Sequence, residues 1–478
     1  MDFQWGFFID FGIISAGLLF ATFLRFKIKF LQKYLIPNPL TAGFVLLIIY
    51  NLFEYTKFLS TDNLGTFVYH LLSLSFIAMT LKQSSKRINN NGPLLFANSV
   101  SLIFQYAIQA VIGLLMTILF IKTLYPDLFP AFGLFVPLGF SQGPGQSFAI
   151  GKNWESFGFS GAGSVGLTFA AIGFLYACFG GVWLINYGIR KNWLSKEKLA
   201  VIRERGIRTG LHKKNGASPE GSKLTSESEA IDTLSLNFAM VLGVYLLSFL
   251  LLKLITWGLS LLGPTGKDLG DTLWGINFVF SALTAILIKQ GLKSFKIDYI
   301  MDNGMLNRIT GFSVDYMVTA SIAAISITVL WQYMVPILIT SLVAGAVVIA
   351  TVPWFCSRIF KDHQFDRMLL IFGASTGTMP TGLALLRVVD PDFETPAASD
   401  YMFSTGITFP LVIPFILSIN LPAYAYIHDK PLYFWLAVAV AFGYLLFALI
   451  SFLLIAKGKA FRNPRQTWYK RKEEKHGV

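Results

Sequence analysis

The stretch GFSQGPGQS (Gly139–Ser147) lies inside apolar sequence and breaks it with three glycines and a proline. Apolar residues lead up to it from Leu128 and resume after it at Phe148. A second stretch of the same kind, GASTGTMPTG (Gly373–Gly382), lies in the other half of the chain. Both contain Gly-x-Ser-x-Gly closely followed by proline. The sequence therefore predicts two matched breaks in membrane-embedded helices.

Matched breaks of this kind are expected to serve a function. Hydrocarbon tolerates unwound backbone only where protein buries it or where it lines a water-filled cavity. A pair of interrupted apolar segments at corresponding positions of two halves is the best sequence indication of a transporter's binding site. We therefore expect the two breaks to meet near the middle of the membrane.

The composition is that of a protein with many membrane spans. Of the 478 residues, 54% are hydrophobic and 14% are charged, whereas a soluble domain carries about a quarter charged residues. The net charge of +13 is attributed to cytoplasmic loops that face anionic lipid. No basic face on a soluble domain indicates binding of nucleic acid. Cys178 and Cys356 lie within apolar runs and are expected to be free thiols.

The apolar runs divide the chain into two similar halves. The first half has five candidate spans and one break, and a polar linker follows it. The second half repeats this order and adds one further span near the C-terminus. The candidate spans are Gly6–Leu24, Leu40–Phe53, Thr66–Leu81, Leu95–Ile121 and Gly161–Gly188, then Leu234–Leu262, Asp271–Ile288, Ile309–Leu330, Met334–Trp354, Tyr401–Asn420 and Tyr433–Ile455.

The positions of the 39 Lys and Arg residues predict the topology. Most of them lie in the linker, in the C-terminal tail and in every second loop between spans. The positive-inside rule places these segments in the cytoplasm, with the N-terminus outside and the C-terminus in the cytoplasm. This alternation holds only if each break enters and leaves the membrane on one side. Each break is therefore predicted to be a re-entrant hairpin, the first entering from outside and the second from the cytoplasm.

Because five spans precede the linker, a repeated unit after it is necessarily inverted. The predicted fold class is an all-α polytopic membrane protein of about eleven spans. It consists of two inverted-topology repeats of five spans, each with a re-entrant hairpin, and one extra C-terminal span. The predicted units are the first repeat 1–189 with hairpin 128–157, the cytoplasmic linker 190–232, the second repeat 233–421 with hairpin 368–396, the extra span 422–456 and the basic cytoplasmic tail 457–478.

Opened helix turns offer both signs of partial charge at each break. The N–H end of a half-helix suits an anion, and the carbonyl end suits Na⁺. The residues expected to bind the substrate at the two tips are Ser141, Gln142, Gly143, Gly145, Gln146, Ser147, Thr378 and Thr381. Hydroxyl and carbonyl oxygens suit a hard cation, so Ser375, Thr376 and Gly377 are expected to bind Na⁺. No Cys/His cluster in the sequence indicates a transition metal.

Two charged residues within apolar sequence are further candidates, because intramembrane charges are costly. Arg387 follows the second break and can pair with a substrate carboxylate, while contact with lipid headgroups or with Asp390 is an equal alternative. Asp315 can ligate a cation or carry a proton, and a structural ion pair is nearly as good an interpretation.

Two other interpretations of the breaks have less support. Gly and Pro can simply kink packed helices, but two matched breaks that also restore the charge pattern argue against chance kinks. Gly-x-Ser-x-Gly also forms the nucleophile elbow of hydrolases, which requires a strand–turn–helix and a Ser/His/acid set. Neither feature is apparent in the sequence, so an enzyme is not expected.

Three segments resemble the bacterial sodium/glutamate symporter family. KYLIPNPLTAGFV (Lys33–Val45) is similar to the family's Ile-Pro-x-Pro-x-x-Gly-Gly motif. Gly139–Trp154 with Gly158–Gly181 is similar to its first Gly-rich hairpin and the following span, and Phe372–Asp390 to its second hairpin. At the first tip, Gln142–Gln146 (QGPGQ) replaces the family's usual Gly-Gly-His-Gly-Thr. The resemblance implies a dimer of inverted repeats that imports an acidic amino acid with Na⁺ by an elevator-like motion.

The expected function is Na⁺-coupled symport of glutamate or a related small carboxylate anion. The expected setting is a homodimer in the bacterial cytoplasmic (inner) membrane, crossing it many times. A proton-coupled carboxylate transporter is the first alternative, and a channel with two re-entrant loops is the second. The sequence alone leaves these alternatives open.

Overall fold

The computed structural model describes residues 5–34, 36–53, 59, 61–83, 92–191, 193, 221–227, 229–390, 395–463 and 466–468. All regular structure in these residues is helical. Most of the predicted linker, 190–232, and most of the predicted tail, 457–478, lie outside them.

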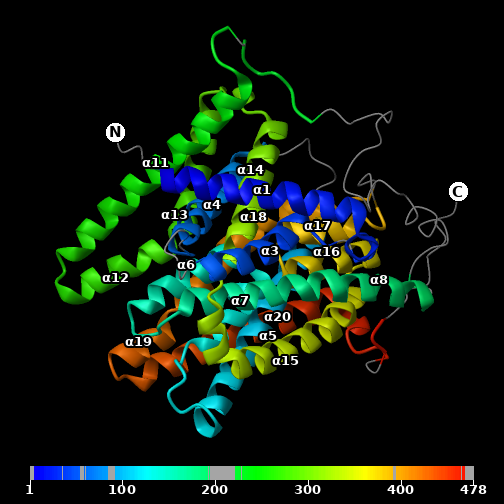
Figure 1. Cartoon of the computed structure of the whole chain (residues 1–478). Helices are drawn as coiled ribbons and strands as arrows, with labels where there is room; N and C mark the ends of the chain where they lie inside the picture. Colours follow the sequence, from blue (N-terminus) through cyan, green and yellow to red (C-terminus); the bar gives the residue numbers. More distant parts are fainter. Residues whose placement is uncertain are drawn as a thin grey trace, which may run out of the picture.

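The described helices follow one another along the chain. In the first half they are α1 (Trp5–Lys27), α2 (Lys29–Lys33), α3 (Asn38–Phe53), α4 (Thr61–Leu81), α5 (Gly92–Thr123), η2 (Phe132–Leu134), η3 (Pro137–Ser141), α6 (Pro144–Glu155), α7 (Ala162–Leu175), η4 (Tyr176–Gly180) and α8 (Gly181–Arg190). In the second half they are α11 (Thr233–Ser260), α12 (Pro264–Gly275), α13 (Asn277–Ser294), η5 (Asp298–Ile300), α14 (Asn303–Ala323), α15 (Ile327–Ile359), α16 (Gln364–Thr376), α17 (Met379–Leu386), α18 (Ala397–Ser418), α19 (Leu421–Ile427), α20 (Pro431–Ala456) and η6 (Lys457–Lys459). Figure 1 shows α1, the α7–α8 rod and α15 running in roughly the same direction.

Eight helical segments of the described residues are long and apolar enough to cross a membrane. They are Trp5–Lys27, Asn63–Leu81, Gly92–Thr123, Ala162–Arg190, Thr233–Ser260, Ile327–Ile359, Ala397–Ile427 and Pro431–Lys459. The other predicted spans correspond to α3, which has 16 residues, to the α12–α13 pair and to α14. The count of about eleven spans therefore stays a prediction.

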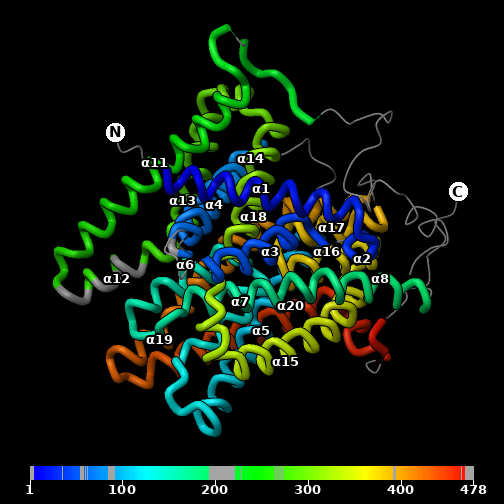
Figure 2. Tube along the Cα trace, viewed as in Figure 1, coloured from blue at the N-terminus to red at the C-terminus, as the bar shows by residue number. Residues whose placement is uncertain are grey.

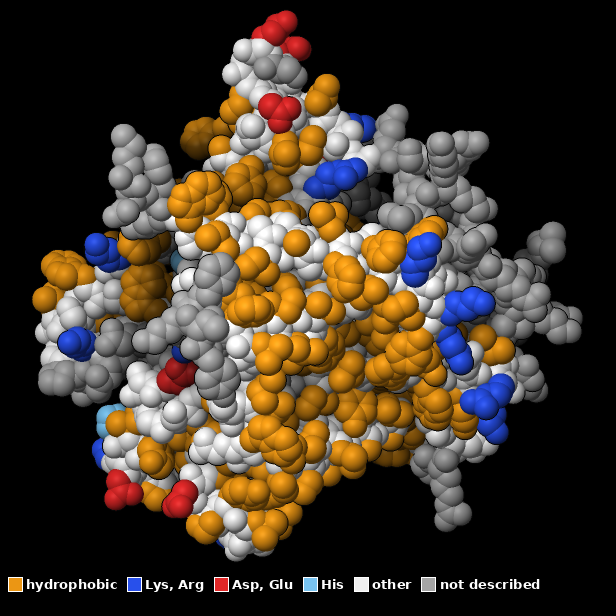
Figure 3. Space-filling view, in the orientation of Figure 1, with side chains coloured by type: hydrophobic (Ala, Val, Ile, Leu, Met, Phe, Trp, Pro, Cys, Tyr) orange, Lys and Arg blue, Asp and Glu red, His pale blue; other side chains and the backbone are white. Residues whose placement is uncertain are grey.

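The surface also has the character of a membrane protein. Figure 3 shows a broad apolar area across the middle of the visible face, while Lys and Arg side chains gather at its right-hand edge, beside the end of α8. Leucines on the outer face of α11 illustrate the pattern, because Leu246 and Leu254 are 58% and 61% exposed. Such exposure suits contact with lipid, where apolar side chains need no covering.

The helices associate in two groups. In the first group, α4 packs against α13 and α14, α3 packs against α1 and α14, and α11 packs against α12 and α13. In the second group, α5 packs against α15, α18 and α20, α7 packs against α6, η3 and α15, and α16 packs against α15 and α17. Figure 2 shows α11 and α12 at the left-hand margin of the view, away from the centre of the second group. We refer to these groups as the first bundle and the second bundle.

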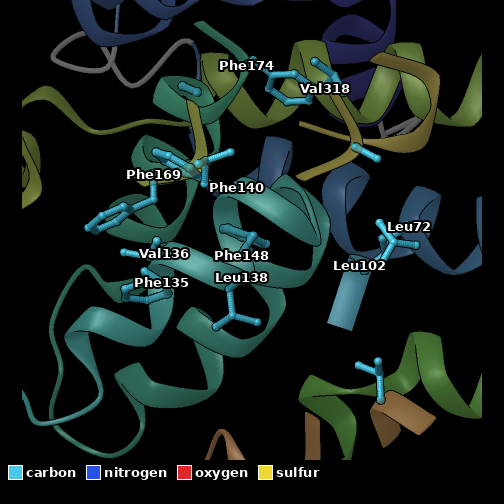
Figure 4. Close-up of a cluster of buried hydrophobic side chains, with 14 of the residues drawn as sticks. Leu72, Leu102, Phe135, Val136, Leu138, Phe140, Phe148, Phe169, Phe174 and Val318 are labelled. Carbon is cyan, nitrogen blue, oxygen red and sulfur yellow. The ribbon is translucent and has the colours of Figure 1, made fainter. Parts of the chain in front are cut away.

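Aromatic side chains fill the second bundle around η3 and α7. Figure 4 shows Phe135, Phe140 and Phe169 together with Val136 and Leu138 in this core. Each of these five side chains is fully buried. Near this core, two glycines bring the backbones of α5 and η2 into contact. A Cβ atom on Gly113 would lie 1.9 Å from the carbonyl oxygen of Gly133. Close approach at small residues is the usual way in which membrane helices pack.

The segment after α20 packs against the end of α15 in the second bundle. Arg358, at the end of α15, is 0% exposed and donates to the carbonyl oxygens of Asn463 at 2.9 Å and Gln466 at 2.8 Å. Trp468 stacks on Trp193 with ring centroids 4.6 Å apart. These contacts hold the last described residues against the end of α15 and against Trp193.

We expect Arg358→Gln to destabilise the protein. Hydrogen bonds from charged donors contribute about 1.5–3 kcal/mol each when buried. The unfolding midpoint of the detergent-solubilised protein, measured by thermal shift, should fall by several degrees. Lys361→Gln is the control, because Lys361 is exposed in the same region. Equal midpoints for the two variants would show that this contact contributes little.

Candidate functional site

The first break has its turn at Gln142 and Gly143. Pro137 begins a π-helical turn that ends at Ser141, and the backbone N–H of Gln142 closes it by donating to the Pro137 carbonyl at 3.1 Å. Gly143 then adopts φ +88° and precedes Pro144, which starts α6. A left-handed φ of this size favours glycine, and proline suits the first position of a helix. The local sequence thus ends one helix and starts another within two residues.

The second break has its turn at Gly377 and Thr378. The α16 helix ends at Thr376, and α17 begins at Met379 with Pro380 in its first turn. The two helices pack closely, because a Cβ atom on Gly373 would lie 2.6 Å from the Cα atom of Gly382. The chain therefore reverses direction at this tip, with two glycines between the arms.

The two tips contact each other. A Cβ atom on Gly143 would lie 2.8 Å from Cγ2 of Thr378. The Ser141 hydroxyl lies 2.8 Å from Oε1 of Gln109 and 3.1 Å from the carbonyl oxygen of Ser375, and both acceptors are within reach of its one proton. Segments more than 230 positions apart in the chain, 141 and 375, are thus joined directly.

Gln109 of α5 joins the two breaks from a third helix. Its Nε2 donates to the Ser375 carbonyl at 2.9 Å, while its Oε1 accepts from Ser141. The side chain is 0% exposed. The sequence reasoning missed this residue. Its signal was two glutamines, Gln105 and Gln109, one helical turn apart in an otherwise apolar run.

A cavity of about 190 Å³ lies beside the tips and between the two bundles. Its walls come from α4, α5, α13 and α14 as well as from both breaks and α18. The polar lining residues are Ser75, Tyr106, Ser141, Gln142, Gln146, Thr378, Tyr401, Thr405 and Thr408. The apolar lining residues include Leu72, Phe76, Met79, Phe278, Met317, Met379 and Phe409. No Asp, Glu, Lys, Arg or His of the described residues lines this first cavity.

Several polar groups at the tips lack partners within the described part of the chain. Both side-chain amide atoms of Gln142, Oε1 of Gln146 and Oγ of Ser375 make no hydrogen bond there. Buried polar groups are normally hydrogen-bonded, so each of these needs an explanation. A bound solute or ion at the tips would provide the missing partners.

A second cavity, of about 470 Å³, adjoins the first. The two share Phe76, Met79 and Met379 among their lining residues. Unlike the first, the second cavity is lined by lysines, namely Lys82, Lys289 and Lys293. Lys289 donates from Nζ to the carbonyl oxygen of Thr80 at 2.9 Å. The second cavity therefore forms a basic approach to the neutral first cavity.

The predicted substrate residues divide between the cavity and its supports. Ser141, Gln142, Gln146 and Thr378 line the first cavity. Thr381 lies behind Thr378, with the two hydroxyl oxygens 3.2 Å apart. The remaining three, Gly143, Gly145 and Ser147, form the tip and the start of α6. Of these, Gly145 faces the first bundle, because its Cβ atom would lie 2.7 Å from Cδ1 of Leu72.

The predicted ion-binding residues Ser375, Thr376 and Gly377 form the end of α16 and the second tip. The Thr376 hydroxyl donates to the Phe372 carbonyl at 2.8 Å, within its own helix. A Cβ atom on Gly173 would lie 2.6 Å from the carbonyl oxygen of Thr376, so α7 covers this carbonyl.

The two charged candidates are not brought to the cavity. Arg387 is exposed at the C-terminal end of α17. Asp315 is exposed on α14, although its neighbours Val314 and Met317 line the first cavity. The structure thus separates both charges from the hairpin tips.

Comparison with known proteins gives one match. A family model described as sodium/glutamate symporter matches residues 9–394. This range includes both breaks, Gln109 and every helix that lines the two cavities except α18, before which it ends. No curated protein and no solved structure matches the chain.

Proposed function

Because the chain belongs to the sodium/glutamate symporter family, we propose that it imports a small carboxylate together with Na⁺. Membership makes it a membrane transporter and not an enzyme. Glutamate is the substrate that the family name suggests, and Na⁺ is the suggested coupling ion. We further propose that it works in the bacterial cytoplasmic membrane, as a homodimer.

The observation that carries this proposal is the meeting of the two tips beside a cavity. Ser141 and Gln109 join the first break to the Ser375 carbonyl of the second. Broken helices that meet near the membrane midplane are how secondary transporters build substrate and ion sites. We assign substrate binding to the four tip residues that line the first cavity: Ser141, Gln142, Gln146 and Thr378.

We assign Na⁺ binding to the end of α16, at Ser375, Thr376 and Gly377. Helix C-termini carry partial negative charge, and hard cations prefer oxygen ligands. The unpartnered Ser375 hydroxyl supports the assignment. Na⁺ would then lie beside the substrate, so that each raises the affinity for the other, which is the requirement for coupling.

We propose that the two halves are inverted repeats with the boundaries predicted from the sequence. Corresponding helix pairs support this, since α3 packs on α14 as α13 packs on α4. In the same way α5 packs on α18 as α7 packs on α15. A structure in which equivalent helices exchange partners between halves is what an inverted repeat produces.

We propose that the second bundle moves against the first, as in an elevator. Of the second bundle, α6 makes most of the contacts with the first, through α4, α12 and α14. Phe148 of α6 packs closely against Gly65 of α4. A Cβ atom on Gly65 would lie 2.3 Å from the Phe148 ring. The second cavity separates α4 and α13 from α18 at the opposite end. With the N-terminus outside, this arrangement is a cytoplasm-facing state.

Hydrogen bonds between helix ends support the predicted topology. Asn51 contacts Ile325 and Ile327, and all three lie on the side predicted to be outside. Gln83 and Asn303 exchange hydrogen bonds on the side predicted to be cytoplasmic.

Uptake into proteoliposomes tests the function. A Na⁺ gradient should drive accumulation of at least one amino acid or carboxylate, and replacing Na⁺ by choline should abolish it. No Na⁺-dependent accumulation of any acidic amino acid, dicarboxylate or neutral amino acid would contradict the proposal. Large unitary currents in electrical recordings would favour a channel instead.

Asp315→Asn separates Na⁺ coupling from proton coupling. Because Asp315 lies outside the first cavity, we expect the variant to retain Na⁺-dependent uptake within about twofold of the wild type, as substitutions away from such features usually have small effects. The measurement is initial uptake rate against Na⁺ concentration and against a pH gradient. Loss of uptake in this variant, with normal protein levels, would indicate that Asp315 takes part in ion coupling.

A further inference from the structure

The first cavity is poorly suited to a solute with two carboxylates. Its described lining has no Lys, Arg or His. The lysines of the second cavity do not help, because none of them lines the first. A buried carboxylate without a positive partner is costly, since neutral hydrogen-bond donors replace only part of its hydration.

The helix ends at the tips supply about one positive charge. The α6 helix has 12 residues and the α17 helix has 8, and both begin at a tip. Each helix N-terminus is equivalent to about +0.5 elementary charge, so two of them balance about one carboxylate. Residues of both first turns, Gln146 and Met379, line the cavity. A second carboxylate has no such partner among the lining residues.

The rest of the lining suits an uncharged body. Leu72, Phe76 and Phe278 form an apolar wall opposite the tips, with Met79 and Met317 beside them. Among the described residues, Gln142 adds an amide group in which both atoms are unpartnered, and Gln146 adds an unpartnered Oε1. An amide both donates and accepts, so it matches a carboxamide or hydroxyl better than it matches a carboxylate, which only accepts.

We propose that the first cavity selects a solute with one carboxylate and an uncharged, largely apolar body over a dicarboxylate such as glutamate. The inference rests on the proposed function, since it concerns the substrate of the same site. An α-amino acid with an uncharged side chain and a simple monocarboxylate share the single carboxylate and the uncharged chain beyond it, and the amino acid adds an ammonium group next to the carboxylate. Sodium is assigned to the end of α16, where the partial negative charge of the helix C-terminus and oxygen ligands stabilise it.

Binding of matched solutes tests the inference. The full chain, purified in detergent, is titrated by calorimetry with glutamate, glutamine, methionine and hexanoate, in NaCl and in choline chloride. Glutamine has the size of glutamate without the second charge, and hexanoate lacks the amino group. In NaCl, the best of the three solutes with an uncharged body should bind at least tenfold more tightly than glutamate. The affinity of hexanoate relative to the two amino acids shows whether the cavity prefers a simple monocarboxylate or an α-amino acid.

A charge placed at the tip provides a second measurement. Met379 lines both cavities and is half-buried, so Met379→Arg brings a guanidinium to the substrate side of the second tip. In this variant the affinity for glutamate, relative to the affinity for glutamine, should rise by at least tenfold, because Arg pairs bidentately with a carboxylate. Met379→Leu is the matched control, which adds neither a charge nor a hydrogen-bonding group, and its ratio should stay within twofold of the wild type.

The outcomes separate this inference from the proposed function. Na⁺-dependent binding in which glutamate comes within tenfold of the best other solute, or exceeds it, overturns the inference and leaves the transporter in place. No Na⁺-dependent binding of any of the four solutes, together with no uptake, overturns the proposed function itself. If Met379→Arg does not fold, the comparison of solutes on the wild-type chain still decides the question.

Discussion

Gln109→Leu should reduce Na⁺-dependent uptake at least tenfold while leaving the protein in the membrane. The substitution keeps the size of the side chain and removes the two hydrogen bonds of Gln109, one with the Ser141 hydroxyl and one with the Ser375 carbonyl. The direct hydrogen bond from Ser141 to the Ser375 carbonyl, at 3.1 Å, then remains between the two segments. Losing the hydrogen-bond partner of a buried polar group costs about 1–3 kcal/mol, so the contact between the two tips is weakened. A shift of 1.4 kcal/mol is a tenfold change in an equilibrium constant, so the proposed site would lose its geometry.

Uptake rates per reconstituted protein measure this effect, with thermal-shift midpoints taken on the same samples. Gln332→Leu is the matched control, because Gln332 is exposed on α15 and far along the chain from both tips. Ser141→Ala completes a double-mutant cycle with Gln109→Leu. If the two act through one contact, the double variant should be little worse than either single one. Uptake by Gln109→Leu within twofold of the wild type would remove this residue from the site.

Gly143→Ala should be equally damaging, for two separable reasons. The residue adopts φ +88°, where a Cβ atom causes strain, and that atom would also lie 2.8 Å from Cγ2 of Thr378. The strain acts within the first tip, whereas the collision forces the two tips apart. We expect at least a tenfold loss of Na⁺-dependent uptake.

A second substitution separates the collision from the strain. Thr378→Ser removes Cγ2 and keeps the hydroxyl, so the double variant Gly143→Ala with Thr378→Ser should recover part of the lost uptake. Gly443→Ala is the control, because a Cβ atom on this α20 glycine meets nothing within 4 Å. Full uptake by Gly143→Ala alone would mean that contact between the tips is not needed for transport.

The apolar runs and the sequence motifs were enough to predict a helical membrane protein with many spans. Membrane spans can be recognised in a sequence, because a helix that crosses the hydrocarbon needs about 20 predominantly apolar residues in a row. The two Gly/Pro breaks and their flanking residues led to the family, which the family model confirmed over residues 9–394. Helix ends at Gly143 and Gly377 followed from local chemistry, since glycine and proline act within a few residues of their own position.

Charged residues drew attention in the sequence, and the structure does not place either of them at the first cavity. Arg387 and Asp315 attracted interpretation because an intramembrane charge is costly and needs a reason. Both side chains are exposed away from the first cavity. Gln109 drew no interpretation, since a neutral amide in an apolar helix has many uses and its partners lie 32 and 266 positions away.

The sequence by itself determined that this chain is a helical membrane transporter of one family, with two broken segments. Spacing, composition and motifs are local properties, and local properties are sufficient for that. Only the tertiary structure decided which side chains meet: Ser141 with the Ser375 carbonyl, Gln109 between them, and a neutral cavity beside a basic one. The physical reason is that these contacts depend on how α5, η3 and α16 pack together, and packing is set by the shapes of many side chains at once.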